Sequence, residues 1–82
     1  MVESYVLRQP EDLNNIQELC DDFYIIVTTH DFGWIRYYIR PSNAFKQTYN
    51  VYDSCNNFID NYTSIVEAVK KCYNQINYEI YG

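Results

Sequence analysis

The residues of this 82-residue chain best suited to chemistry are one histidine, His30, and three cysteines, Cys20, Cys55 and Cys72. Together they could nominally supply four zinc ligands. Structural zinc sites usually bring their ligands in close pairs, whereas the nearest pair here, Cys20 and His30, is ten residues apart. A general base needs a partner in a cleft, and His30 falls in a predicted turn. We therefore expect ordinary cysteines, no metal, no cofactor and no catalytic residue.

The sequence also lacks the longer motifs that enzymes of this size could use. It contains no glycine-rich phosphate loop, nucleophile elbow or metal-binding carboxylate motif. The tripeptide Asp31-Phe32-Gly33 occurs in protein kinases, but 82 residues are too few for a kinase and fit a tight turn better. We predict a single domain spanning residues 1–82 that is not an enzyme.

Acidic residues are concentrated at the start of the chain. Eleven acids and six bases give a net charge of −5, and residues 1–22 contain six of the acids but only one base, Arg8. This sign disfavours direct nucleic-acid binding. It favours a protein partner with a basic surface. The acids of this segment are Glu3, Glu11, Asp12, Glu18, Asp21 and Asp22.

Two further features go beyond what a core requires. Asp21 and Asp22 end a predicted helix, where carboxylates face the negative end of its dipole. They could bind a partner, terminate the helix, or pair with Arg36 or Arg40. Ten tyrosines exceed what so small a core can hold, which favours an interaction surface. An AT-rich genome would also enrich tyrosine, and nine asparagines agree with that alternative.

Hydrophobic patterning predicts the elements that position these residues. The last helix is the clearest, because apolar residues from Tyr62 to Ile80 recur at intervals of three and four, with a capping box at Ser64 and Glu67. In the strand Trp34–Arg40, alternation places Ile35, Tyr37 and Ile39 toward the core and Trp34, Arg36, Tyr38 and Arg40 on the other face. The predicted elements are a possible edge strand Glu3–Arg8, a helix Pro10–Asp21, strands Phe23–Thr29, Trp34–Arg40 and Lys46–Asp53, and the last helix.

This order predicts an α+β fold, in which a three-stranded antiparallel sheet packs against two helices in the order α-β-β-β-α. Double-stranded RNA-binding domains share that order, but they use a lysine cluster where the last helix begins. Here that position reads Asp60-Asn61-Tyr62-Thr63-Ser64. We therefore exclude that function.

The segment Ser64-Ile65-Val66-Glu67, continuing to Tyr73-Asn74-Gln75, is similar to the helix that follows the sheet in small phage-encoded anti-CRISPR proteins. The Cas9 inhibitors among them resemble this chain in element order and acidity. The resemblance implies a non-catalytic inhibitor whose carboxylates occupy the basic cleft of a Cas effector. It leaves open whether the inhibitor mimics DNA or uses another surface.

We therefore expect an acidic, tyrosine-bearing inhibitor of a nucleic-acid-processing host-defence enzyme, encoded by a phage or mobile element. The odd number of cysteines, their wide spacing and the absence of a signal peptide or membrane span predict a cytoplasmic protein. The alternative is a homodimeric accessory or regulatory protein that associates through its sheet face. The expected partner-binding residues are Glu11, Asp12, Glu18, Asp21, Asp22, Asp31, Tyr24 and Tyr38.

Overall fold

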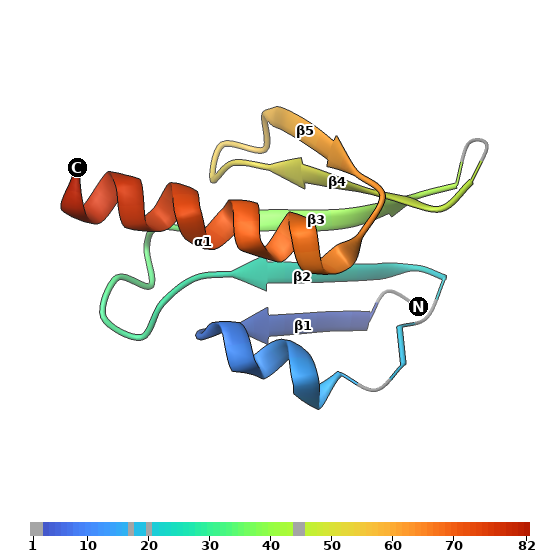
Figure 1. Ribbon diagram of the computed structural model, residues 1–82, viewed down its shortest axis with the longest axis horizontal. Helices are drawn as coiled ribbons and strands as arrows, with labels where there is room; N and C mark the ends of the chain where they lie inside the picture. The colour runs from blue at the N-terminus through green and yellow to red at the C-terminus, as the bar shows by residue number, and fades with distance from the viewer. Residues whose placement is uncertain (1–2, 17, 20, 44–45) are drawn as a thin grey trace.

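The computed structural model describes residues 3–16, 18–19, 21–43 and 46–82. Five strands, one short 3₁₀ helix and one long α-helix make up the fold (Figure 1). The strands are β1 (Glu3–Leu7), β2 (Phe23–Val27), β3 (Tyr37–Ser42), β4 (Thr48–Tyr52) and β5 (Phe58–Tyr62). The helices are η1 (Pro10–Asn15) and α1 (Ile65–Tyr81).

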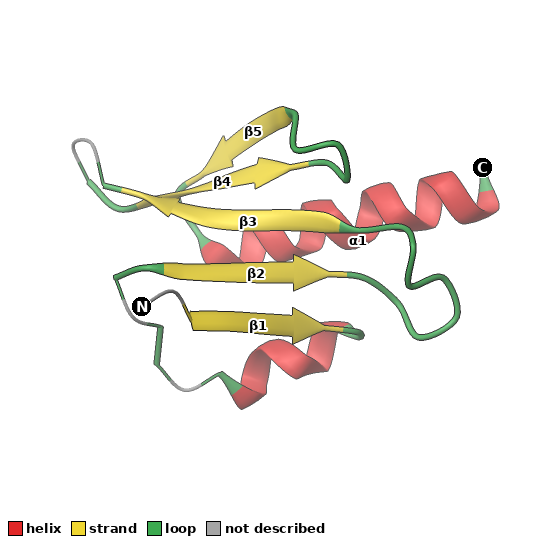
Figure 2. Cartoon of the chain, turned by 180° about the vertical axis from the view of Figure 1, so that it is seen from behind, coloured by secondary structure: helices red, strands yellow, loops and turns green. Residues whose placement is uncertain are grey.

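The five strands form one mixed sheet in the order β1-β2-β3-β4-β5. β1 pairs with β2 in parallel, and every later pair is antiparallel. The helix α1 lies across one face of this sheet, and the other face has no described element in front of it (Figure 2). The fold is α+β, with the hydrophobic core between α1 and the sheet.

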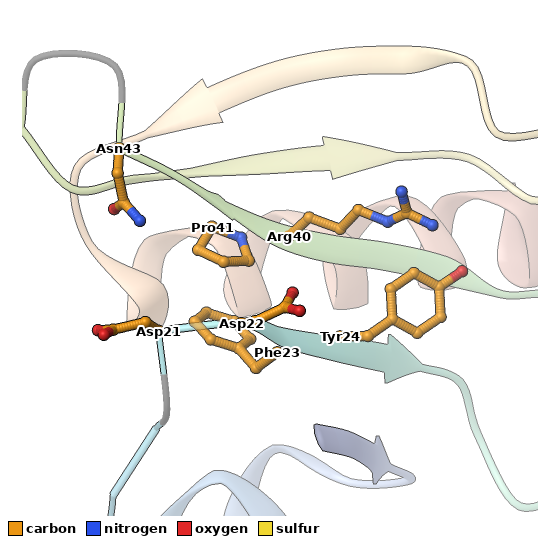
Figure 3. A pocket seen from close by; sticks show the side chains of 7 residues that line it. All are labelled: Asp21, Asp22, Phe23, Tyr24, Arg40, Pro41 and Asn43. Atoms are coloured by element: carbon orange, nitrogen blue, oxygen red, sulfur yellow. The ribbon is translucent and has the colours of Figure 1, made fainter. Parts of the chain in front are cut away.

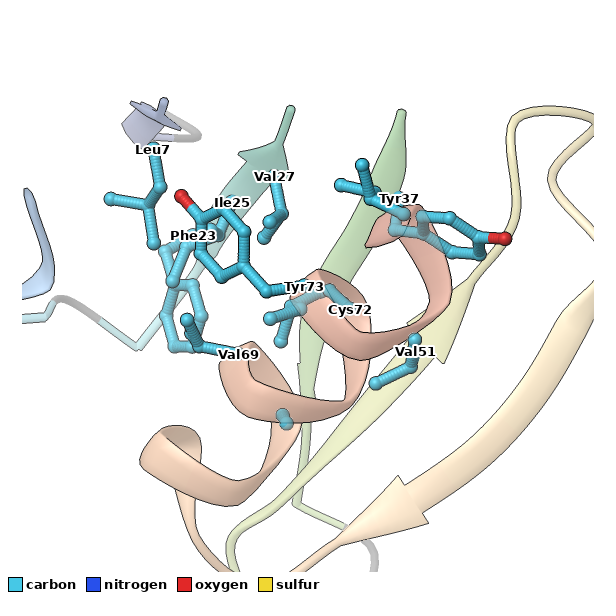
Figure 4. Close-up of a cluster of buried hydrophobic side chains, with 12 residues drawn as sticks. Leu7, Phe23, Ile25, Val27, Tyr37, Val51, Val69, Cys72 and Tyr73 are labelled. Atoms are coloured by element: carbon cyan, nitrogen blue, oxygen red, sulfur yellow. The ribbon is translucent and has the colours of Figure 1, made fainter. Parts of the chain in front are cut away.

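Strict alternation of buried residues along the central strands explains how the core forms. Phe23, Ile25 and Val27 of β2 are buried, and so is Ile39 of β3. The side chains of Phe23, Ile25 and Val27 point toward α1 (Figure 4), which contributes its own buried stripe. That stripe comprises Ala68, Val69, Cys72, Tyr73 and Ile76.

The predicted architecture of three strands between two helices is wrong, because the sheet has five strands and only one long helix packs on it. In place of the helix Pro10–Asp21, the structure has the six-residue η1. Asn14 and Asn15 are poor helix formers, and their positions coincide with its end. Leu13, Ile16 and Leu19 still pack against the core, whereas Cys20 lies outside the described residues.

The strand missed by the prediction is β5. Aspartate and asparagine are depleted in strands, so Asp60 and Asn61 made the sequence of β5 look like a turn. The preceding turn nevertheless returns the chain alongside β4. Asp53 makes this turn, since its Oδ1 accepts hydrogen bonds from the backbone N–H of Cys55 at 2.9 Å and of Asn57 at 2.8 Å. Strand pairing with β4 then overrides the local preference of these residues.

The connection between β2 and β3 is longer than the tight turn that the sequence predicts. The predicted strand Trp34–Arg40 begins at Tyr37 in the structure, and Trp34 is 70% exposed in the connection. Thr28 helps to shape this connection, because its buried Oγ1 donates a hydrogen bond to the Ile35 carbonyl at 3.0 Å. The buried side chains of Tyr37 and Ile39 agree with the predicted inner face.

The helix α1 agrees best with the sequence pattern, although its cap does not. Ser64 occupies the N-cap position without a side-chain hydrogen bond, so the predicted capping box is absent. Val66, which the periodicity placed on the buried stripe, is 44% exposed. In the part of the chain that the structure describes, no helix has the length and apolar character needed to cross a membrane.

Candidate binding surface

The sheet face opposite α1 carries a continuous apolar band. Because successive side chains of a strand alternate, the residues between the buried ones point to this open face. Strand pairing aligns one such residue from each strand in a single row, and its last pair, Tyr52 with Phe58, follows a register shift between Val51 and Tyr52. We call it the apolar row, and it consists of Val6, Ile26, Tyr38, Tyr52 and Phe58. Val6 is 48% exposed and Phe58 59% exposed, so water reaches both ends of the row.

A second row with polar character lies one step toward the amino end of β2. There the guanidinium carbon of Arg40 lies 4.7 Å from the centre of the Tyr24 ring and 5.9 Å from that of Tyr52. The Tyr24 ring also stacks on Tyr38, with centroids 5.2 Å apart and an angle of 17° between the rings. These contacts hold Arg40 and the tyrosines in fixed positions.

The same row continues onto β4 and β5 through amides. The Asn61 side-chain amide donates hydrogen bonds to Asn50 Oδ1 at 2.6 Å and to Thr48 Oγ1 at 2.9 Å. Tyr52 and Phe58 pack edge to face nearby, with centroids 6.0 Å apart. The open face therefore combines ordered aromatic rings, one stacked cation and a small polar network.

Opposite charges occupy the two ends of this face. At the amino end of β2, Asp21 and Asp22 line a hollow of about 500 Å³ together with Tyr24 and Arg40 (Figure 3). Figure 3 shows the Asp22 carboxylate inside this hollow and the Arg40 guanidinium pointing away from both carboxylates, toward Tyr24. The remaining lining residues are Phe23, Pro41 and Asn43.

The other end of the face is basic. Arg8, which follows β1, and Arg36, which precedes β3, line a smaller hollow of about 130 Å³ beside Val6 and Ile26. Arg36 Nε donates a hydrogen bond to the Gly33 carbonyl at 2.7 Å, which fixes the direction of its side chain. With Arg40, the face therefore carries all three arginines of the sequence.

The predicted partner-binding residues divide into separate groups. Tyr24, Tyr38 and Asp22 lie on the open face, with Asp21 at its acidic end. Glu18 is exposed in the segment that leads to this end. The structure does not bring the remaining acids to it, because they follow the opposite ends of β1 and β2. These are Glu11 and Asp12 in η1 and Asp31 in the connection between β2 and β3.

Asp12 has a structural role in its own turn. Its Oδ2 accepts hydrogen bonds from the backbone N–H of Arg8 at 2.8 Å and of Gln9 at 3.2 Å. The Arg8 bond in particular holds the pKa of the Asp12 carboxyl below its ordinary value of 3.8. Because its lone pairs already serve the backbone, Asp12 is a weak candidate for partner binding.

The described residues considered for chemistry, Cys55, Cys72 and His30, lie in different parts of the fold. Cys55 is exposed in the Asp53 turn, whereas Cys72 is buried under the sheet, where burial raises the pKa of its thiol to about 12. His30 is exposed in the connection after β2. Among the described residues, no group of three or more histidine, cysteine, aspartate or glutamate side chains could hold a metal ion.

Of the apolar row, only Tyr38 is among the predicted partner-binding residues, whereas Val6, Ile26, Tyr52 and Phe58 are not. Alternation alone identified Tyr38 and Arg40 as outward-facing. Tyr52 and Phe58 required knowledge of β5 and its register, and Val6 required the parallel pairing of β1 with β2.

Comparisons with known proteins leave the geometry as the main guide to function. No protein-family model, curated protein or solved structure matches this chain. The resemblance to anti-CRISPR proteins therefore stays a prediction from the sequence.

Proposed function

We propose that this chain is a non-catalytic binding protein whose acidic, tyrosine-bearing surface docks on a basic surface of a protein partner. The observation that carries the proposal is the hollow lined by Asp21, Asp22 and Tyr24, in which the Asp22 carboxylate points toward Tyr24 and the Asp21 carboxylate lies on the far side (Figure 3). A lysine or arginine of the partner that entered this hollow would form a charge-assisted hydrogen bond with Asp22, and Asp21 would add to the negative potential there.

The ordered state of Tyr24 supports this role. Tyr24 is half-buried and stacked on Tyr38, with Arg40 over its ring. A side chain that is already immobilised loses little conformational entropy when a partner binds. Tyrosine is also enriched among the residues that dominate interface energetics. Tyr24 and Tyr38 would therefore be the anchors and the carboxylates the source of selectivity.

The partner class that we propose is a nucleic-acid-processing host-defence enzyme, with CRISPR effectors as the first candidates. Such enzymes hold nucleic acid in positively charged channels, to which a carboxylate-lined hollow is complementary. The sequence resemblance to anti-CRISPR proteins supports the same class, a phage or mobile-element origin and action in the host cytoplasm. With only part of the predicted acids at one end of the face, inhibition would depend on local docking more than on extended DNA mimicry.

The test compares the double variant Asp21→Asn/Asp22→Asn with the control Asp60→Asn/Glu67→Asn. Both remove two exposed carboxylates, but the control residues lie on β5 and α1. Binding to a Cas effector loaded with guide RNA is measured by biolayer interferometry at low and high salt. We expect the first variant to lose affinity about tenfold, since two charge pairs worth up to about 1 kcal/mol each are lost, and the control to bind like the wild type.

Circular dichroism of both variants establishes that they fold. Equal affinity of wild type and Asp21→Asn/Asp22→Asn would show that the hollow is not the binding site. If no effector binds the wild type at any salt concentration, the proposed partner class is wrong.

A further inference from the structure

The open face of the sheet has the composition of an interface. A sheet face that remains in water is normally polar, yet the apolar row crosses all five strands. Figure 2 shows no described element in front of these strands. Exposed apolar bands bordered by charged residues are typical of surfaces that bind protein.

The opposite charges at the two ends of this face indicate the charge pattern that a protein partner must have. Asp22, which precedes β2, and Tyr24 and Ile26 within it are successive outward positions that alternate with buried residues. Thr28 continues this row after β2 but is itself buried, and its hydroxyl donates a hydrogen bond to the connection before β3. Asp22 marks the acidic end, and Arg8 and Arg36 flank the level of Thr28 at the basic end. About 20 Å of strand separates the two ends.

We propose that a second copy of this chain covers the open face, turned end for end about a two-fold axis. The axis runs across the strands at the level of Ile25, parallel to the sheet. This rotation places Asp22 of each copy against Arg8 and Arg36 of the other. It also places the row of Tyr24 and Arg40 on the apolar row of the other copy. The proposal needs no foreign partner and does not rest on the proposed function.

Charge complementarity selects this orientation over the other face-to-face arrangement. A two-fold axis along the strands would place arginine against arginine and aspartate against aspartate, which is repulsive. The net charge of −5 makes most other contacts between two copies repulsive as well. Because this face carries all three arginines, it offers acidic residues of another copy their main cationic target.

Burying Arg40 in this interface would cost less free energy than burying a fully hydrated cation, because its guanidinium already contacts aromatic rings. Its guanidinium lies 4.7 Å from the Tyr24 ring centre and 5.9 Å from that of Tyr52. Arginine tolerates such stacked, partly dry sites better than lysine because its charge is delocalised and weakly hydrated.

The size of the face predicts a weak dimer. Five strands about 4.8 Å apart and about 20 Å long give about 500 Å² for each copy, or about 1,000 Å² in total. Specific protein interfaces begin near this total. We therefore expect dimerisation in the micromolar range, with faster dissociation at high salt.

The test uses charge reversal at both ends of the face, measured by sedimentation equilibrium over about 1–500 μM. Asp22→Lys opposes two cations in its own homodimer, Arg8 and Arg36, and Arg36→Glu opposes the carboxylate of Asp22, so each variant alone should dimerise at least tenfold more weakly. In a mixture of the two, Lys faces Glu in one contact and the native Arg36 faces the native Asp22 in the other. We expect the mixture to form heterodimers with affinity near that of the wild type.

Matched controls are Glu67→Lys and Lys70→Glu, exposed reversals on α1 that should leave the dimer unchanged. Circular dichroism shows whether each variant folds. If a charge reversal does not fold, the neutral change at the same position, Asp22→Asn or Arg36→Gln, replaces it and should also weaken the dimer. A wild type that stays monomeric at 500 μM overturns the proposal. So does a mixture that fails to associate when both of its members are folded. Arg36→Glu leaves both carboxylates of the hollow in place, which keeps this test separate from that of the proposed function.

Discussion

Two buried tyrosines, Tyr37 and Tyr73, differ in whether the hydroxyl group has a hydrogen-bond partner among the described residues. Tyr37 on β3 donates its hydroxyl to Glu79 Oε1 at 3.0 Å, which links the start of that strand to the last turns of α1. The buried hydroxyl of Tyr73 has no hydrogen-bond partner among the described residues. Burial raises the pKa of both phenols, to about 12 for Tyr37. Both are therefore neutral at physiological pH, and only one is satisfied.

Removing each hydroxyl should have opposite consequences. Tyr37→Phe loses a hydrogen bond to a carboxylate, and we expect the free energy of unfolding to fall by about 1–2 kcal/mol. Tyr73→Phe removes an unsatisfied polar atom, so stability should stay equal or rise by about 1 kcal/mol. Urea denaturation at pH 7 measures both. A loss for Tyr73→Phe as large as that for Tyr37→Phe would show that its hydroxyl has a partner.

Asp53 gives the turn before β5 a dependence on pH. Two backbone N–H groups bond its carboxylate, and the bond from Asn57 is the main cause that lowers its pKa below 3.8. A folded-state pKa below the unfolded one means that the unfolded chain binds more protons. The stabilisation is therefore present above the unfolded pKa and disappears as the pH falls through the folded pKa.

The variant Asp53→Ala should accordingly be less stable than the wild type at pH 7. The difference between the two should shrink steadily as the pH is lowered from about 5 to about 2. Urea denaturation across this range measures it. Asp60→Ala is the matched control, and a constant difference for Asp53→Ala would show that the turn does not depend on its charge.

At the scale of elements, the sequence predicted best those elements whose apolar residues follow a strong pattern. Dense β-branched and aromatic residues identified β2, and the 3–4 spacing identified α1, because both patterns report directly on a buried face. The failed prediction at Pro10 shows the limit of such patterns. Leu13, Ile16 and Leu19 repeat with helical spacing and do pack against the core. The same burial is achieved here by a short 3₁₀ turn and extended chain.

The candidate surface was predictable only in part, for a related reason. Alternation within one strand placed Tyr38 and Arg40 on the outer face. Which residues lie beside them depends on register, and register depends on the turn at Asp53 and on the parallel pairing of β1. Neither is encoded in a short pattern, since parallel pairing joins segments about 20 residues apart. The acidic residues of the first 22 positions were therefore expected at one site, although the structure separates them.

At the scale of the whole molecule, the two proposals share one carboxylate. Asp22 would pair with Arg8 and Arg36 of a second copy, and it also lies in the hollow proposed for a basic partner. The two associations therefore exclude each other. Self-association reduces the concentration of protein available to a partner. The face would be covered at high concentration and open after dilution or on encounter with a tighter-binding partner.

This exclusion makes Arg36→Glu a gain-of-function variant at high concentration. At concentrations well below the dimer dissociation constant, it should bind a guide-loaded Cas effector like the wild type, since Asp21 and Asp22 are unchanged. At concentrations tenfold above that constant, most of the wild type is dimeric, and its apparent affinity should be about threefold to fivefold lower than that of Arg36→Glu. Titration of labelled effector with each protein measures the difference. Equal curves for two folded proteins, with the wild type shown to be dimeric, would mean that the partner does not use the face that the dimer covers.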